Sequence, residues 1–216
     1  MKLRPSFGPD DNEATYHYKE PHCSIKLQGV FSSLLTRFDP EEDRDIIVLC
    51  IGTDRSTGDA LGPLTGTRLR GLGLPDSCVY GTLDDPVHAT NLSEVLTMIR
   101  SHYENPLVIP VDACLGKIDR VGNLNIRCGT LSPGTAVKKD LPAVGEFHIS
   151  GNVNVSGFLE HMVLQNTRLS LVMSMADVVS RAIFFALYQR TNPNLRHLEP
   201  PLFYPTGHLN NVSLQP

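Results

Sequence analysis

The chain has 216 residues, of which 41% are hydrophobic and 19% are charged, so its composition predicts a globular domain and excludes a disordered chain. Its 19 basic and 23 acidic side chains give a net charge of −4, which indicates neither a nucleic acid nor an anionic membrane as a partner. The uninterrupted apolar runs are far shorter than the roughly 18 residues of a membrane span, and no signal peptide is visible. We therefore expect a cytoplasmic protein.

Composition divides the chain into three parts. Residues 1–22 are polar and proline-containing without any periodicity, and residues 192–216 contain five prolines. Segments of this kind are typical of arms and tails rather than of a core. We expect an N-terminal arm, a single α/β domain over residues 23–191 and a Pro-rich C-terminal tail.

The first part of the domain alternates between helical and strand patterns. Apolar residues over 27–38 recur at helical spacing behind Ser24, a candidate N-cap, and predict an amphipathic helix. Residues 46–51 form a continuous apolar run, which is typical of a strand buried on both faces. A Gly-rich turn follows, and then a helix that we expect to end near residues 71–73.

The next elements continue this alternation. Residues 78–81 favour a short strand, Asn91 with Glu94 resembles a capping box that opens a helix, and residues 107–111 favour a third strand. Strands that alternate with helices predict βαβ units. The fold class we expect is α/β, a three-layer α/β/α arrangement with a mostly parallel sheet.

The second half is less regular. Residues 122–128 alternate like a strand, residues 131–145 suggest a loop, and residues 147–153 favour an extended segment. We then expect a short helix near 157–165, a strand at 169–173 and a helix with an apolar stripe over 175–187.

The segment CIGTDRSTGDALGP, residues 50–63, joins the first strand to its helix, which is where α/β sheets place ligands. It matches neither a P-loop nor G-x-G-x-x-G. Asp59 would also stand at the start of the helix, where its carboxylate repels a phosphate. The sequence therefore disfavours a nucleotide cofactor, although Asp59 could simply cap the helix.

A second carboxylate, Asp112, ends the third strand in VIPVDACLG. With a strand order of 2-1-3, Asp59 and Asp112 would meet at the point where the order reverses. Of two adjacent carboxyl groups, one keeps its proton as a general acid while the other activates water, unless the pair binds a metal. Pro110 is unexpected here, because its missing N–H is normally confined to edges and bulges. Cys114 is not expected to be a nucleophile, because nearby carboxylates raise the pKa of a thiol.

Other polar side chains are candidates for the rim of the same site. Asp84 and Asp85 favour a turn, while His88 would reach the same edge of the sheet. His148 follows a Pro- and Gly-containing loop and is either a cleft residue or a structural histidine. We expect no permanently bound metal, because stable sites usually need three or four ligands and the pair Asp59 and Asp112 supplies two.

These motifs resemble the YyaC-type sporulation protein family, small relatives of the germination protease of spore-forming bacteria. The resemblance covers residues 46–190. It rests on the segments GTDRSTGDALGP, PVHATNL, DACLG, LPAVGEFHISG and GNVNVSGFLEHMVLQNTRLSLVMSMAD. The wider group includes the hydrogenase maturation proteases, so the resemblance also implies a phosphorylase/hydrolase-like α/β/α fold.

The resemblance implies an acidic endopeptidase pair at Asp59 and Asp112, with no cofactor. Hydrogenase maturation proteases add a histidine that binds nickel of the precursor, and His148 would match that third ligand. We expect Asp54, Gly58, His88 and His148 to bind substrate. The germination protease is longer and is made with an N-terminal propeptide, whereas this chain is compact and its first 45 residues show no clear processing site.

The resemblance also suggests partners and a location. The expected partner is a peptide or protein substrate, such as the small acid-soluble spore proteins, with neither nucleic acid nor membrane, and a homo-oligomer is compatible with the sequence. The expected location is the cytoplasm of the forespore or the spore core. Two alternatives stay open: a non-catalytic protein that binds a peptide or partner, and a metal-assisted maturation-type protease.

Overall fold

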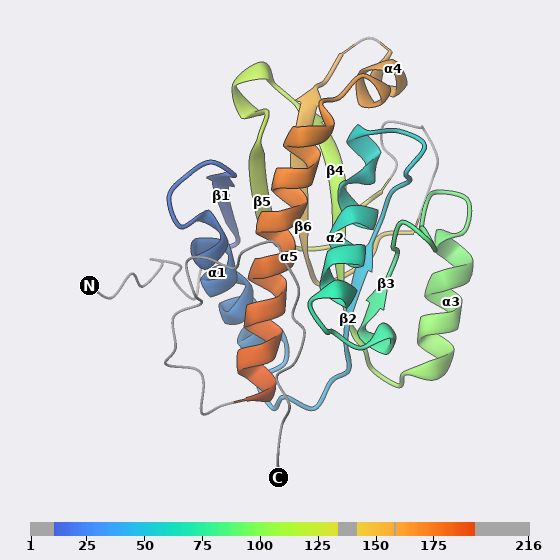
Figure 1. Cartoon of the computed structure of the whole chain (residues 1–216). Coiled ribbons are helices and arrows are strands. Elements are labelled where there is room, and N and C mark those ends of the chain that lie inside the picture. The colour runs from blue at the N-terminus through green and yellow to red at the C-terminus, as the bar shows by residue number, and fades with distance from the viewer. Residues whose placement is uncertain (1–10, 134–141, 158, 193–216) are drawn as a thin grey trace.

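A computed structural model describes residues 11–133, 142–157 and 159–192 of the chain. Its described part contains one six-stranded sheet with the order β1-β5-β6-β4-β2-β3 (Figure 1). The strands are β1 (Glu13–His17), β2 (Ile46–Cys50), β3 (Val79–Tyr80), β4 (Leu107–Gly116), β5 (Asn123–Cys128) and β6 (Phe147–Val155). β2, β3, β4 and β6 are parallel, whereas β5 pairs antiparallel with both β1 and β6. The α/β class is confirmed, and the sheet is mixed.

Helices lie on both faces of this sheet. The main helices are α1 (Cys23–Phe38), α2 (Leu61–Gly71), α3 (Leu92–His102), α4 (Glu160–Gln165) and α5 (Leu169–Thr191). Short 3₁₀ turns are η1 (Gly58–Ala60), η2 (Asp76–Cys78) and η3 (Ile118–Arg120). α1, α5 and α2 lie side by side on one face, and the apolar residues of α3 pack on the other (Figure 1).

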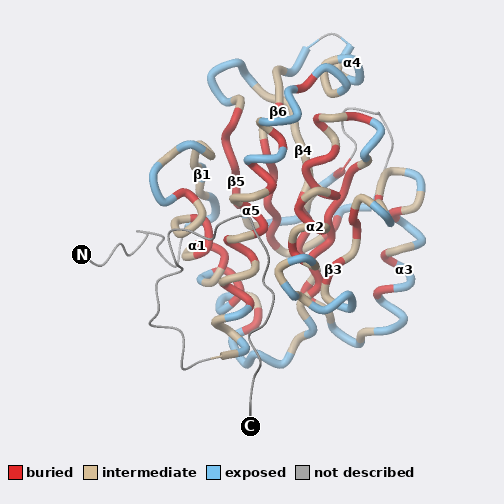
Figure 2. Tube along the Cα trace, in the orientation of Figure 1, coloured by how far each residue is buried: buried red, intermediate tan, exposed pale blue. Residues whose placement is uncertain are grey.

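The side chains of β2 are buried on both faces of the sheet. Val48 and Cys50 belong to the larger apolar cluster with α1, α2 and α5, whereas Ile47 and Leu49 belong to the smaller cluster with α3. Successive side chains of a strand point to opposite faces, so a continuous apolar run is needed wherever both faces are covered. Figure 2 shows buried residues concentrated along the strands and the inner sides of the helices.

Three expected elements differ from the structure. Residues 13–17, which the sequence places in an arm, form β1 at the edge of the sheet and pair with β5. Ser24 is not the N-cap of α1, because the helix already includes the buried Cys23, and His22 precedes it in the left-handed region. The segment 169–173 is not a strand but the first turn of α5, since Val172 continues the buried stripe of that helix. A short apolar run alone cannot distinguish these two structures.

β4 is twice as long as expected and its course explains Pro110. Val111 accepts a hydrogen bond from Ile51 N–H, so the odd-numbered residues of β4 face β2. Pro110 therefore faces the β6 side, where the ladder begins one residue later at the pair Val111 and Ile149. The missing N–H of Pro110 leaves no rung of that ladder unmade.

α5 is the one helix in the described residues that is long and apolar enough to cross a membrane, with a mean hydropathy of 1.6 over 18 residues. The same composition is required of a core helix. α5 packs against α1, α2 and the sheet, and it buries residues such as Met175, Val179 and Ile183 completely. Its place in the fold is that of a core helix.

Candidate functional site

A tight turn after β2 places Asp59. Thr53 N–H donates to the backbone carbonyl of Asp59 at 3.1 Å, and Gly52 approaches the same carbonyl so closely that a Cβ would lie 1.9 Å from its oxygen. Gly52 also has a φ of 141°, which favours glycine. The N-cap of α2 is Ala60, and no side chain caps this helix. Asp59 is therefore not the helix cap, and its carboxyl group is available for another role.

Asp112 lies where β2 ends. Cys50, the last residue of β2, is paired with Val111, and Asp112 is the next residue of β4. The Asp112 carboxylate accepts a hydrogen bond from the adjacent Ala113 N–H at 2.8 Å. The predicted 2-1-3 order is confirmed, because β4 and β3 flank β2.

Both carboxyl groups line one cleft of about 650 Å³. Its walls are residues 51–53, 55 and 56 of the turn after β2, residues 88–90, the β4 segment 112–115, residues 131–133 and one face of α4. This volume lies within the range of roughly 300–1,000 Å³ that is usual for ligand sites. The structure thus brings Asp59 and Asp112 together at the edge of the sheet where the sequence predicts a site.

The two carboxyl groups differ in their electrostatic environment. Burial, together with repulsion by the charge of Asp59, raises the pKa of Asp112 to about 8. Burial also raises the pKa of Asp59, but a backbone hydrogen bond from Thr53 and the nearby His88 and His161 act in the opposite direction. Asp112 therefore holds a proton more firmly than Asp59 does.

His88 lies in the cleft, as the sequence predicts. Its Nδ1 is 2.8 Å from the Thr90 hydroxyl group, and its backbone N–H donates to the Asn91 side chain at 2.8 Å. Asn91 therefore holds the loop that carries His88 and makes no capping hydrogen bond to α3. The half of the expected capping box that the Asn91 side chain would supply is therefore not formed.

The other expected substrate-binding residues do not line the cleft. Asp54 is exposed and is not among the residues that line the cleft. Gly58 is buried beneath α4, where a Cβ would lie 2.8 Å from both Leu164 and Thr167, so its small size permits packing. Asp54 therefore has the environment of a surface residue, and Gly58 has that of a residue that permits close packing.

His148 is buried on β6, outside the cleft lining. Its Nδ1 lies 3.0 Å from the carbonyl oxygen of Gly129, and burial lowers its pKa. Ser150, two residues later, is the β6 partner of Asp112 and does line the cleft. His148 thus lies two residues before the β6 position that pairs with Asp112. It has the contacts of a structural histidine.

Ser56, Glu160 and His161 are among the cleft residues that the sequence analysis missed. Glu160 and His161 belong to α4, which follows β6. Because β6 is parallel to β4, the chain leaves β6 at the same edge of the sheet as Asp112. That topology would have indicated α4, but β6 was expected only as an extended segment of unknown pairing.

The described residues contain no cluster of three or more His, Cys, Asp or Glu side chains arranged to hold a metal ion. Asp59 and Asp112 therefore remain a pair, with His88 and His161 near Asp59. Cys114 also lines the cleft, but burial raises the pKa of its thiol to about 11, and the thiol donates to Asn152. The acid–base groups available in the cleft are therefore carboxyl and imidazole groups.

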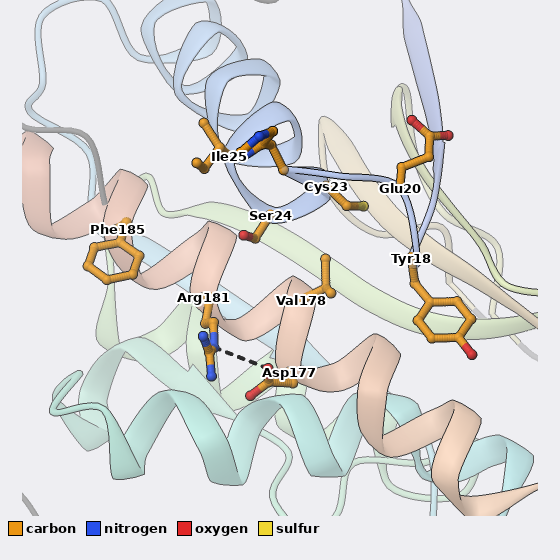
Figure 3. Close-up of a pocket in the computed structure, with 10 residues that line it drawn as sticks. Tyr18, Glu20, Cys23, Ser24, Ile25, Asp177, Val178, Arg181 and Phe185 are labelled. Carbon is orange, nitrogen blue, oxygen red and sulfur yellow. Dashed lines mark ion pairs between the residues drawn. The ribbon is translucent and has the colours of Figure 1, made fainter. Parts of the chain in front are cut away.

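A second, smaller cavity of about 240 Å³ lies between the start of α1 and the middle of α5 (Figure 3). Its most polar contact is the ion pair of Asp177 with Arg181 at 3.1 Å, drawn as a dashed line in Figure 3. Cys23 faces this cavity with its pKa raised to about 11 by burial. The cavity has no paired carboxyl groups, so the larger cleft is the candidate active site.

The chain is similar to a protein family, to a bacterial protein and to a solved structure. The family model "Protein of unknown function (DUF1256)" matches residues 15–182. The chain is 50% identical over 175 residues to "Uncharacterized protein YyaC" of Bacillus subtilis (strain 168), which covers 81% of this chain and 83% of that protein. A solved structure, the [NiFe] hydrogenase maturation protease HycI from Thermococcus kodakarensis KOD1, aligns with a TM-score of 0.47 and 19% identity, over 74% of this chain and 99% of that chain.

Proposed function

The chain belongs to the DUF1256 family and is a relative of Bacillus subtilis YyaC, as its motifs predict, and we propose that it is an endopeptidase that uses Asp59 and Asp112. The observation that carries the proposal is the shared cleft, in which the pKa of Asp112 is raised to about 8 by burial and by the charge of Asp59. One protonated and one ionised carboxyl group are the pair with which aspartic proteases activate water for amide hydrolysis.

Each carboxyl group has one role in the proposed reaction. Asp59, ionised, accepts a proton from a water molecule whose oxygen attacks the carbonyl carbon of a peptide bond. Asp112, protonated, donates its proton toward the departing amide nitrogen as the C–N bond breaks. Water is thus divided between the new carboxyl and amine ends, and the aspartates exchange the proton before the next cycle.

The proposed substrate is a protein, with the small acid-soluble spore proteins of the forespore or spore core as the first candidates. This part of the proposal is supported by the similarity of GTDRSTGDALGP and DACLG to the motifs of the germination protease. A metal-assisted mechanism with His148 as a third ligand receives less support, because His148 bonds to Gly129 and lies outside the cleft lining.

The test is cleavage of purified small acid-soluble spore proteins, followed by mass spectrometry. We expect Asp59→Asn and Asp112→Asn each to lower the rate by roughly 10²-fold or more, because general acid–base catalysis contributes about 10²- to 10⁴-fold. Asp84→Asn is the matched control, since Asp84 is exposed and outside the cleft.

Equal rates in the wild type and in all three variants would refute the aspartate mechanism. Binding of the spore proteins without any shortened product, even over long incubation, would instead support a protein that binds a partner and does not cleave it.

A further inference from the structure

β4 is longer than β2 and leaves part of its own edge without a neighbouring strand. The pairing of β2 with β4 ends at Cys50 and Val111, whereas β4 continues to pair with β6 as far as Gly116 and Val155. On the side of β2, the β4 segment 112–115 instead lines the cleft.

The hydrogen bonds identify which backbone groups face this side. Successive residues within a sheet direct their N–H and C=O groups to opposite neighbours. Val111 bonds to β2 through Ile51 N–H, and Gly116 bonds to the β6 side through Ser156 N–H, both at 2.8 Å. The register shift near Cys114 adds its extra residue to β6 and not to β4. Ala113 and Leu115 therefore direct their backbone groups toward the cleft.

The first of these groups already has a partner, and the next ones do not. Ala113 N–H donates to the Asp112 carboxylate. Among the residues that the structure describes, none on the side of β2 bonds to Ala113 C=O or to Leu115 N–H. Unpaired strand edges of this kind are templates for an added strand.

A second observation, in the turn after β2, also indicates a ligand. Ser56 lines the cleft and is only 6% exposed. Its hydroxyl group is buried without a hydrogen-bond partner in the described part of the chain. A buried hydroxyl group without a partner is unfavourable, and a bound polar group would satisfy it.

We propose that the cleft binds an unfolded polypeptide segment as an added strand along Ala113–Leu115 of β4. The proposal rests on the proposed function, because it places the backbone of the substrate in the cleft that Asp59 and Asp112 line. Leu115 N–H and Ala113 C=O form the new ladder, and Ser56, in the turn after β2, bonds to the segment. Recognition through the main chain is tolerant of sequence, so folded proteins are excluded while many unfolded chains are accepted.

The binding test uses full-length Asp59→Asn protein, which prevents turnover, and α-lactalbumin as the probe. Reduced and carbamidomethylated α-lactalbumin is unfolded, while native α-lactalbumin has the same sequence in folded form. We expect binding of the unfolded form only. Binding of neither form, or equal binding of both, would overturn the proposal.

Amide hydrogen exchange by NMR then locates the bound segment without a further substitution. We expect the unfolded probe to slow exchange at Leu115 by tenfold or more and to leave Cys114 unchanged, because Cys114 N–H already faces β6. Binding that leaves Leu115 exchange unaltered would overturn the proposal.

Substitution gives an independent measurement. Leu115→Pro removes the N–H group and part of the side chain, whereas Leu115→Ala removes the side chain and keeps the N–H group, so the ratio of their Kd values isolates the hydrogen bond. We expect Leu115→Pro to bind the unfolded probe about two- to tenfold more weakly than Leu115→Ala. Ser56→Ala should also weaken binding without lowering Tm. Equal Kd values for the two Leu115 variants would overturn the proposal.

Wild-type protein separates this proposal from the proposed function. If the unfolded probe binds with Leu115 protected but is never cleaved, edge binding stands and the peptidase assignment fails. If the probe is cleaved with the same KM by Leu115→Pro and Leu115→Ala, the peptidase assignment stands and edge binding fails.

Discussion

Asp59 and Asp112 set the pH dependence of the proposed activity. The base must be ionised, so activity should fall as pH decreases through the pKa of Asp59, which burial raises. The acid must be protonated, so activity should also fall as pH rises through the pKa of Asp112, about 8. We predict a bell-shaped profile of kcat/KM with its alkaline limb near pH 8. A rate that rises steadily from pH 7 to pH 10 would contradict these roles.

The raised pKa of Asp112, which serves the proposed activity, should lower the stability of the folded protein. Asp112 titrates near 3.9 in an unfolded chain but near 8 in the folded protein. Between these values unfolding releases a proton, so this group makes the folded state less stable as pH rises from about 4 to about 8. We predict that Asp112→Asn raises stability at pH 8 by on the order of 2 kcal/mol, after allowance for its partial exposure.

Thermal unfolding at pH 4, 6 and 8 measures this effect. The Tm of Asp112→Asn should exceed that of the wild type by about 5 °C at pH 8, and the difference should be smallest at pH 4. Asp84→Asn, at an exposed turn, controls for the loss of a negative charge. A gain that shrinks as pH rises would show that the pKa of Asp112 is not raised in the folded state.

At the scale of elements, α2 contacts the sheet through glycine. A Cβ at Gly66 would lie 2.0 Å from the backbone oxygen of Gly81, whereas a Cβ at Gly71, at the end of the same helix, would meet nothing within 4 Å. We predict that Gly66→Ala lowers the free energy of unfolding by about 2–3 kcal/mol, because helix and strand must separate. Gly71→Ala should raise it by about 0.5–1 kcal/mol. Urea unfolding of both variants tests this, and equal effects would contradict the close contact.

The same scale separates what the sequence could predict from what it could not. The strands β2 and β4 and the convergence of Asp59 with Asp112 follow from local patterns and from the right-handed connections of parallel strands. His148 depends on the register of β6, and a shift along a strand changes which level of the sheet a side chain reaches. The first turn of α5 was assigned to a strand because the five residues 169–173, four of them apolar, are too few to show a decisive period.

His161 and Ser56 could not be found by pattern for a different reason. His161 approaches Asp59 only because the chain after β6 returns across the cleft as α4, which is a property of the tertiary path. Ser56 stands in a turn whose sequence does not reveal which side chain is buried. Residues that meet only because distant segments of the chain come together can be identified only from the structure. Residues at the ends of strands with a clear apolar pattern can be identified from the sequence.

At the scale of the whole molecule, an ion pair joins the two helices that are furthest apart in the sequence. Asp39, directly after α1, accepts hydrogen bonds from Asp43 N–H and Arg44 N–H and pairs with Arg190 in the last turn of α5. The side chain of Asp39 is 1% exposed and that of Arg190 is 12% exposed. A charge so deeply buried depends on its partner, since removal of that partner leaves an uncompensated carboxylate.

We predict that Arg190→Ala lowers the free energy of unfolding by about 3 kcal/mol, and Tm by about 10 °C, because the Asp39 carboxylate loses its partner. Arg127→Ala is the matched control: its pair with Glu13 has side chains 50% and 63% exposed, so the loss should stay below about 1 kcal/mol. Urea unfolding followed by circular dichroism measures both. Equal losses in the two variants would mean that the contact between the ends of α1 and α5 depends on apolar packing alone, in which case replacing Arg190 by methionine would restore stability better than replacing it by lysine.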